Sequence, residues 1–157
     1  MIAQNLDIAK NLIEKWKKLE KKIVFTNGCF DIVHRGHIEY LSDAKKYGNK
    51  LVVAINSDSS IQTIKGKSRP IQNEKDRAII IDAIKPVDLV LIFDQDNPRE
   101  VILKLLPDIL VKGGDYALEN IIGANIVSQN GGKVKIIPFR YGNSTSKIIN
   151  KILAQNN

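Results

Sequence analysis

The sequence has 157 residues, of which 43% are hydrophobic and 26% are charged, as expected for one globular domain. Its net charge of +7 is spread along the chain and only 6% of its residues are aromatic, which argues against nucleic-acid binding; we interpret the charge as a lysine-rich surface or as a preference for phosphorylated ligands. No stretch approaches the roughly 18 apolar residues of a membrane span, no signal peptide is visible, and the single cysteine excludes an intrachain disulfide, so we expect a cytoplasmic protein without membrane partners.

The chain is expected to begin with a helix over about residues 6–21, where apolar residues recur with helical spacing between lysines. We therefore divide it into a helical extension, 1–22, and a main domain, 23–157. After the extension, short apolar runs alternate with helical segments. Strands are expected at 23–26, 51–55, 89–93, 109–111 and 134–137, helices at about 36–47, 74–84, from 97 onward, 119–129 and 145–153, and a polar loop at 58–72.

This alternation predicts an α/β fold, namely a Rossmann-like open parallel five-stranded sheet with helices on both faces. Ligands of such sheets bind beyond the carboxyl ends of the strands, near the point where the strand order reverses. Functional residues are therefore expected directly after strands.

Such residues follow the first expected strand and end in His34 and His37, which are the only histidines of the chain. Their spacing places both imidazoles on one face of a helix. Gly36 between them lets a phosphate group approach the backbone, and the start of a helix attracts anions. A metal site is the alternative, but nearby carboxylates would have to complete it because no third histidine exists. The pattern favours phosphate binding.

Several segments resemble the cytidylyltransferase-like nucleotidyltransferases. The run from His34 to His37 resembles their His-x-Gly-His signature, and Gly142-Asn-Ser-Thr145 resembles the Gly-x-Ser-Thr segment that opens their last helix. Three segments are most similar to the heptose 1-phosphate adenylyltransferase branch: Phe-Thr-Asn-Gly-Cys-Phe-Asp at 25–31, Lys-Gly-Lys-Ser-Arg-Pro at 65–70 and Val-Lys-Gly-Gly-Asp-Tyr at 111–116. The similarity runs from about residue 23 to residue 152.

The resemblance implies transfer of AMP from ATP to D-glycero-β-D-manno-heptose 1-phosphate, giving pyrophosphate and ADP-heptose, a precursor of surface polysaccharide. The chemistry needs no general base, because the second pKa of a phosphate is about 6 and the attacking oxygen is already largely deprotonated. The remaining tasks are to position two polyanions and to stabilise charge on the α-phosphate. Mg²⁺ is expected to accompany ATP, with substrate phosphates as most of its ligands and no protein ligand assigned.

Position and resemblance together assign the candidate residues. The expected catalytic residues are His34 and His37, which contact the triphosphate, and Lys65, which lies in the loop 58–72 and closes over the substrates. Nucleotide-binding residues are expected after the first and fourth strands and before the last helix, namely Asn27, Gly28, Cys29, Phe30, Gly36, Gly113, Asp115, Gly142, Asn143, Ser144, Thr145 and Ser146. The expected substrate-binding residues are Asp31, Lys67, Arg69 and Arg77.

Simpler structural roles stay open for some of these residues. The Gly-Gly-Asp run at 113–115 also suits a tight turn, and the polar residues at 142–146 also suit a helix N-cap. Asp31 could instead stabilise a turn, and Arg77 could instead be a surface residue of its helix.

Two alternative functions stay open. One is a cytidylyltransferase that acts on glycerol 3-phosphate or another small phosphate, and the other is a non-catalytic nucleotide-binding regulatory module. Related cytidylyltransferases carry an arginine three residues before the glycine that corresponds to Gly142; Phe139 stands here, which argues against CTP.

We expect a homodimer, as in related enzymes. The apolar stripe of the first helix, which includes Trp16, is expected to pack either on its own domain or on the partner subunit. Many relatives are fused to a sugar kinase. Only about 22 residues precede the first expected strand here, so we expect any such kinase to be a separate chain.

Overall fold

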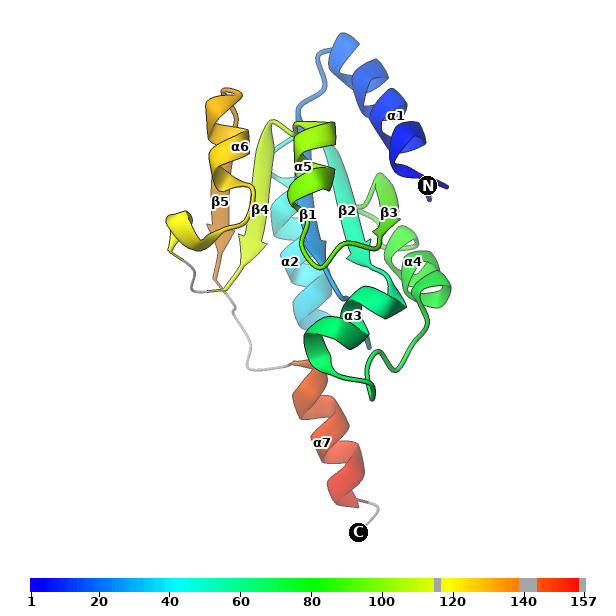
Figure 1. Cartoon of the computed structure of the whole chain (residues 1–157). Helices are drawn as coiled ribbons and strands as arrows, with labels where there is room; N and C mark the ends of the chain where they lie inside the picture. The colour runs from blue at the N-terminus through cyan, green and yellow to red at the C-terminus, as the bar shows by residue number, and fades with distance from the viewer. Residues whose placement is uncertain (115–116, 139–143, 156–157) are drawn as a thin grey trace.

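The computed structural model describes residues 1–114, 117–138 and 144–155, and a parallel sheet of five strands lies at its centre (Figure 1). The strand order is β3-β2-β1-β4-β5, so the order reverses between β1 and β4. This reversal makes the carboxyl edge of β1 and β4 the expected ligand site. The strands are β1 (Ile23–Gly28), β2 (Lys50–Asn56), β3 (Leu89–Phe93), β4 (Ile109–Gly113) and β5 (Lys133–Ile137).

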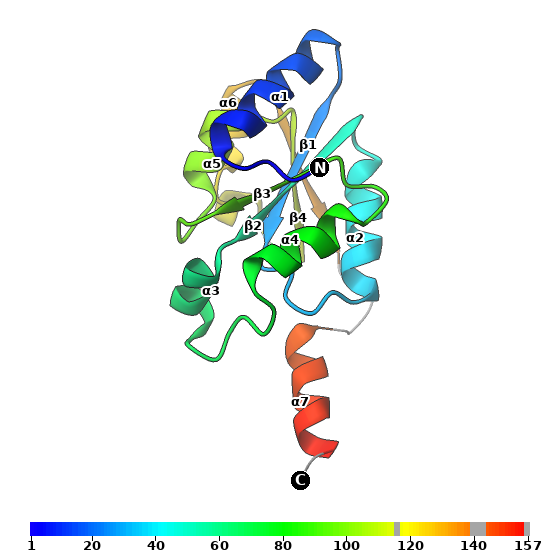
Figure 2. The ribbon, with the colours of Figure 1, turned by 90° about the vertical axis from the view of Figure 1, so that its right-hand side faces the viewer.

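Helices cover both faces of the sheet (Figure 2). Alternate residues of a strand point to opposite faces, so Ile23 and Phe25 of β1 enter one hydrophobic core and Val24 enters the other. We call these two sides the α5 face and the α2 face. The α5 face is covered by α1 (Leu6–Lys18), α5 (Arg99–Leu105) and α6 (Ala124–Gln129), and the α2 face by α2 (Arg35–Lys45) and α4 (Glu74–Asp82).

The predicted open parallel α/β sheet is confirmed, and each strand ends within two residues of its expected position. The largest differences concern β1 and β4, which continue to Gly28 and Gly113. Asn27 and Lys112 are therefore strand residues rather than loop residues, and this fixes the directions of their side chains.

The expected loop 58–72 is wrong in its first half, which forms the helix α3 (Asp58–Lys65). The Ser57 side chain caps this helix by accepting a hydrogen bond from the Ser60 N–H, and Ile61 is fully buried. The polar residues Ser57 and Asp58 therefore begin a helix here rather than a loop.

The helix expected at 119–129 is interrupted. A short 3₁₀ turn, η1 (Leu118–Asn120), comes first, and α6 begins only after Gly123. Gly123 has φ +88°, and a Cβ atom there would lie 2.5 Å from the Ile102 side chain. The close approach of α5 therefore requires glycine at this break.

The residues before β1 are part of the same packed structure. Ala9 and Ile13 of α1 are buried in the core of the α5 face, and Trp16 packs against that core. Ile2 forms a parallel bridge with Val90 of β3 at the edge of the sheet. The apolar stripe of the first helix thus packs on its own domain.

The last helix, α7 (Thr145–Gln155), extends away from the carboxyl edge of the sheet (Figures 1 and 2) and has no buried residue. Within the described ranges, no helix is both long and apolar enough to cross a membrane.

Candidate active site at the carboxyl edge of the sheet

The connection from β1 to α2 adopts an unusual backbone. Phe30 has φ +47° and Ile32 has φ +51°, both in the left-handed region that residues with side chains rarely adopt. Each such residue costs about 1–3 kcal/mol and persists only where its surroundings fix it. The connection must therefore be held by other contacts.

Arg77 of α4 supplies three of these contacts. Its guanidinium donates hydrogen bonds to the backbone oxygens of Cys29 (2.7 Å) and Gln72 (3.0 Å) and to the Asp58 carboxylate (2.8 Å). The Arg77 side chain is fully buried. It joins the β1–α2 connection to the segments that begin α3 and α4, so this geometry gives it a positioning role and leaves it no surface for the expected contact with a sugar phosphate.

Asp31 holds the connection from the other side. Its carboxylate accepts hydrogen bonds from the Arg69 side chain (2.8 Å) and from the N–H groups of Ile71 (2.9 Å) and Gln72 (3.0 Å). Burial alone would raise the pKa of Asp31, but these hydrogen bonds and the Arg69 charge outweigh it and keep the pKa below its ordinary value. Asp31 and Arg69 are thus engaged with each other, where a substrate contact was expected.

The two histidines stack at the start of α2. Their ring centroids lie 3.9 Å apart with an angle of 27° between the planes, and the His34 N–H donates to His37 Nδ1 over 3.3 Å. A Cβ atom at Gly36 would lie 3.0 Å from the His34 ring and would push this ring slightly out of place, so glycine suits the close packing. Because Nδ1 of His37 accepts a hydrogen bond, the neutral ring carries its proton on Nε2, where it can be donated to a phosphate oxygen.

The surroundings of both histidines favour the neutral form. Burial, together with the nearby charges of His34 and Lys65, lowers the pKa of His37 from 6.5 to about 4. Burial also lowers the pKa of His34. A bound polyphosphate would raise both pKa values, because a nearby negative charge favours the protonated form.

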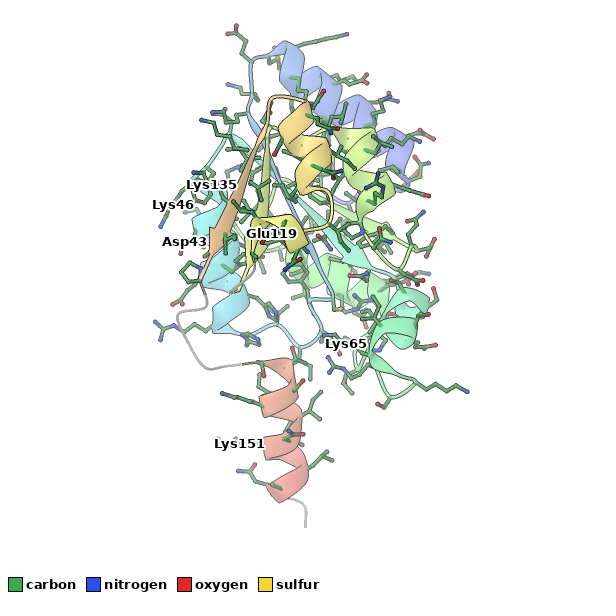
Figure 3. All side chains as sticks on the ribbon, turned by 60° about the vertical axis from the view of Figure 1, so that its left-hand side comes forward. Asp43, Lys46, Lys65, Glu119, Lys135 and Lys151 are labelled. Carbon is green, nitrogen blue, oxygen red and sulfur yellow. The ribbon has the colours of Figure 1, made fainter. Side chains whose placement is uncertain are left out.

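Lys65 is the last residue of α3 and lies on the exposed surface near the carboxyl edge (Figure 3). Its positive charge contributes to the lowered pKa of His37. Lys67 lies two residues further on and is also exposed. The structure thus brings Lys65 near the histidines but leaves it without a fixed position against them.

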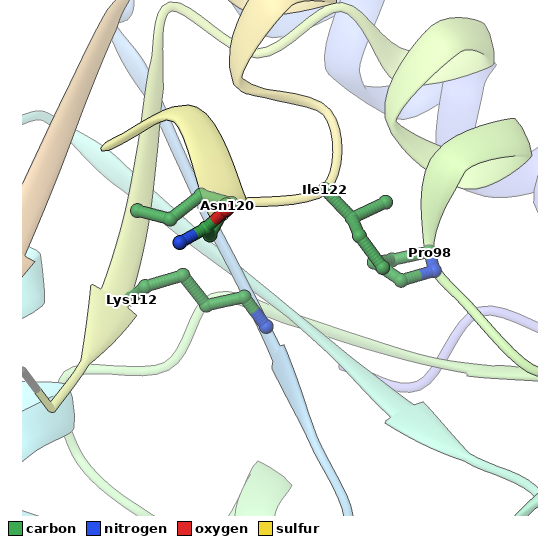
Figure 4. Close-up of a pocket in the computed structure, with 5 residues that line it drawn as sticks. Pro98, Lys112, Asn120 and Ile122 are labelled. Atoms are coloured by element: carbon green, nitrogen blue, oxygen red, sulfur yellow. The ribbon is translucent and has the colours of Figure 1, made fainter. Parts of the chain in front are cut away.

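A second group of polar residues lies on the α5 face, where Lys112 of β4 donates a hydrogen bond to Asn27 Oδ1 of β1 over 2.7 Å. Lys112 lines a cavity of about 150 Å³ with Pro98, Asn120, Ile121 and Ile122 (Figure 4). Burial lowers the pKa of Lys112 to about 8, although the neighbouring Cys29 acts to raise it. Sequence reasoning missed Lys112 because β4 was expected to end at Val111.

The other candidates lie along the same edge. Phe30 is buried beside His37, with ring centroids 5.3 Å apart. Thr145 Oγ1 donates to the Asp31 backbone oxygen over 2.5 Å, and Ser144 Oγ accepts from the Lys147 N–H, as a helix cap does. Gly28 and Gly113 end their strands, Cys29 is half-buried and Ser146 is exposed, whereas Asp115, Gly142 and Asn143 lie outside the described residues.

No cluster of three or more histidine, cysteine, aspartate or glutamate residues that could hold a metal ion occurs within the described residues. Asp31, three residues before His34, is already bonded to Arg69.

Comparisons with known proteins identify the family of the chain. The family model described as cytidylyltransferase-like matches residues 25–151. The bifunctional protein HldE of Citrifermentans bemidjiense is 48% identical over 151 residues, which is 96% of this chain. The HldE protein of Campylobacter jejuni subsp. doylei is 54% identical over 143 residues, or 91% of this chain. The chain spans only 31% and 30% of the lengths of these two relatives.

Solved structures give the same result. The lipopolysaccharide core biosynthesis protein from Thermoplasma volcanium GSS1 is 30% identical with a TM-score of 0.60, and the match covers 78% of this chain and 99% of that one. Pantoate-beta-alanine ligase from Francisella tularensis, at 17% identity and a TM-score of 0.63 over 88% of this chain and 66% of its own, shares the fold alone. The resemblance seen in the sequence is confirmed, and the chain belongs to the cytidylyltransferase-like family of nucleotidyltransferases.

Proposed function

We propose that the protein transfers AMP from ATP to D-glycero-β-D-manno-heptose 1-phosphate and releases pyrophosphate. The observation that carries the proposal is the stacked pair His34 and His37 at the start of α2, in a chain of the cytidylyltransferase-like family. The heptose acceptor is supported by the resemblance of residues 25–31, 65–70 and 111–116, by the identity to HldE proteins, and by the likeness to a protein of lipopolysaccharide core biosynthesis.

The proposed reaction is an in-line displacement. An oxygen of the acceptor phosphate forms a bond to the α-phosphorus of ATP, the bond from that phosphorus to the bridging oxygen breaks, and its electron pair leaves with pyrophosphate. The imidazole N–H groups and the N-terminus of α2 stabilise the charge that develops on the phosphate oxygens. Mg²⁺ would neutralise triphosphate charge and would be bound mainly by the phosphates themselves.

Lys65 is the proposed clamp. It ends α3, and Gly66 follows with φ +91° and no atom within 4 Å of the position a Cβ would take. Residues 66–68 therefore have the conformational freedom and the space to move toward a bound triphosphate, whereas Asp31 holds the chain from Arg69 onward. Closure would bring the positive charge of Lys65 to the phosphates that the two neutral histidines contact. Lys67 would be a second contact to these phosphates.

Pyrophosphate release tests the proposal. Purified protein is incubated with Mg²⁺, one of ATP, CTP, GTP or UTP, and a panel that includes heptose 1-phosphate, hexose 1-phosphates and glycerol 3-phosphate. The expected result is release with ATP and heptose 1-phosphate and formation of ADP-heptose. Preference for CTP with glycerol 3-phosphate would favour a cytidylyltransferase, and no release with any pair would favour a regulatory nucleotide-binding module.

A homodimer in the cytoplasm is part of the proposal. The apolar stripe of α1 is used within the subunit, so the interface is expected elsewhere, and α7 offers the exposed Leu153 beyond the edge of the sheet. A cytoplasmic location suits an enzyme that consumes ATP and has a free thiol at Cys29.

A further inference from the structure

Lys112 is a half-buried cation at the point where the strand order reverses. An ammonium group has three N–H donors, and one of them is given to Asn27 Oδ1. The ion pairs that the described residues form all involve other cations. Asn27 therefore fixes the side chain of Lys112 without neutralising its charge, and burial makes an anionic partner favourable.

The cavity beside Lys112 has a mixed lining. Lys112 and the Asn120 amide lie on one side, and Pro98 and Ile122 lie on the other (Figure 4). Its volume of about 150 Å³ is roughly ten times the 15 Å³ or so that a single water needs. A sugar phosphate matches this lining, because it combines an anion, hydroxyl groups and an apolar ring surface.

At the carboxyl ends of β1 and β4, the two faces of the sheet carry different side chains. On the α2 face, Tyr40 of α2 bonds to Thr26 of β1 (2.6 Å) and to the Val111 oxygen of β4 (3.2 Å). Asn27 and Lys112 are the next residues along the same two strands, so their side chains point to the opposite, α5 face. The histidine pair and Lys112 thus lie on either side of the reversal point between β1 and β4.

In-line displacement requires the attacking and leaving oxygens on opposite sides of the α-phosphorus. If the histidines at the start of α2 bind the leaving pyrophosphate, the acceptor must approach from the α5 face. We propose that Lys112 binds the phosphate group of the acceptor sugar phosphate, with the sugar in the adjoining cavity. This inference rests on the proposed nucleotidyl transfer and adds the side from which the acceptor enters.

The test distinguishes an effect on binding of the sugar phosphate from an effect on binding of ATP. Steady-state kinetics and calorimetric ATP binding are measured for wild type and for Lys112→Met, which keeps the length of the side chain but removes the charge. The expected result is a 10- to 100-fold higher KM for the sugar phosphate, about the effect of losing a charge-assisted hydrogen bond, with the Kd for ATP within about twofold of wild type. Lys112→Arg is expected to recover part of the loss.

Lys50→Met is the matched control, since Lys50 is a half-buried lysine at the other end of the sheet, paired with Asp88. It should leave both constants unchanged, and thermal unfolding checks that each variant is folded. Unchanged acceptor KM in folded Lys112→Met, or a loss of ATP affinity as large as the loss for the acceptor, overturns the inference while the proposed function stands. Absence of pyrophosphate release by wild type with every acceptor overturns both. Should Lys112→Met not fold, the acceptor KM of folded Lys112→Gln decides by the same criterion.

Discussion

The β1–α2 connection and the end of α3 both carry candidate catalytic groups, yet they are built in opposite ways. The connection that leads to His34 has strained residues and is held by the buried side chains of Asp31 and Arg77. Lys65 and Gly66 at the end of α3 are exposed, and a side chain at Gly66 would have no neighbours. The site therefore combines a preorganised half, which positions the phosphates, with a half that is free to close over them.

The preorganised half should dominate the chemistry. His34→Ala and His37→Ala are each expected to lower kcat by roughly two or more orders of magnitude, with smaller changes in substrate binding, because the donors act on charge that develops in the transition state. Steady-state kinetics of both variants, checked for folding by circular dichroism, give the answer. Folded variants that keep near-normal kcat would remove the histidines from the mechanism.

A substitution of Arg77 tests whether this side chain stabilises the β1–α2 connection or instead binds a ligand. Arg77→Met should lower the free energy of unfolding by about 3 kcal/mol, since it leaves Asp58 and two backbone oxygens without their donor. Denaturant unfolding measures this, and Arg35→Met, which breaks an exposed pair with Glu39, should cost below about 1 kcal/mol. A stable Arg77→Met enzyme with only a raised acceptor KM would instead restore Arg77 as a substrate contact.

The free half should respond to the nucleotide. Amide hydrogen exchange of residues 66–68 is expected to slow when ATP and Mg²⁺ are added, and Lys65→Ala should abolish that protection and raise the KM for ATP about tenfold. Lys10→Ala, an exposed site on α1, serves as the control. Equal exchange with and without nucleotide would argue against closure.

Stability should depend on pH through the histidines. The pKa of His37 is about 4 in the folded protein, whereas the ordinary histidine value of 6.5 applies to the unfolded chain. Protonation of His37 therefore favours unfolding. The stabilisation is complete above pH 6.5 and is lost as the pH falls toward 4, and His34 adds to the loss in the same direction. Unfolding free energies measured from pH 7 to pH 4.5 should fall less steeply for His37→Gln than for wild type. Parallel curves would show that His37 is not buried as described.

The smallest effect is expected for Trp16, which packs on its own domain. Trp16→Ala should lower the melting temperature but leave the dimer dissociation constant unchanged, whereas Leu153→Glu should weaken the dimer. Light scattering across micromolar concentrations measures both. Weaker association in Trp16→Ala would place α1 at the interface, and a monomeric wild type at every concentration would refute the dimer.

Much of the fold follows from the sequence because buried parallel strands are continuous apolar runs. Leu89–Phe93 is such a run, and β3 has those bounds. The start of α3 was missed because Ser57 and Asp58 suit a loop as well as a helix cap, and only the burial of Ile61 distinguishes the two.

The candidate site is less predictable, because a charged residue in a sequence does not reveal its partner. Asp31 and Arg69 are 38 residues apart and bind each other, and Arg77 binds Asp58 across 19 residues. All of them lie around the β1–α2 connection, but whether each touches a ligand or another side chain depends on tertiary contacts that the sequence does not reveal. Lys112 was missed for a related reason, since its direction depends on where β4 ends.

The bridge between Ile2 and Val90 affects how the sheet meets other proteins. Exposed edge strands offer unpaired N–H and C=O groups that can recruit a strand from another molecule and start aggregation. At β3 that edge is covered by the chain's own first residues, through the Ile2 bridge and the hydrogen bond from Ala3 N–H to the Val90 oxygen. At β5, the other edge of the described sheet, Lys133 and Lys135 are exposed and place positive charge along the strand. One edge is thus partly covered by the backbone and the other carries positive charge, and both features disfavour pairing with a copy of the same sheet.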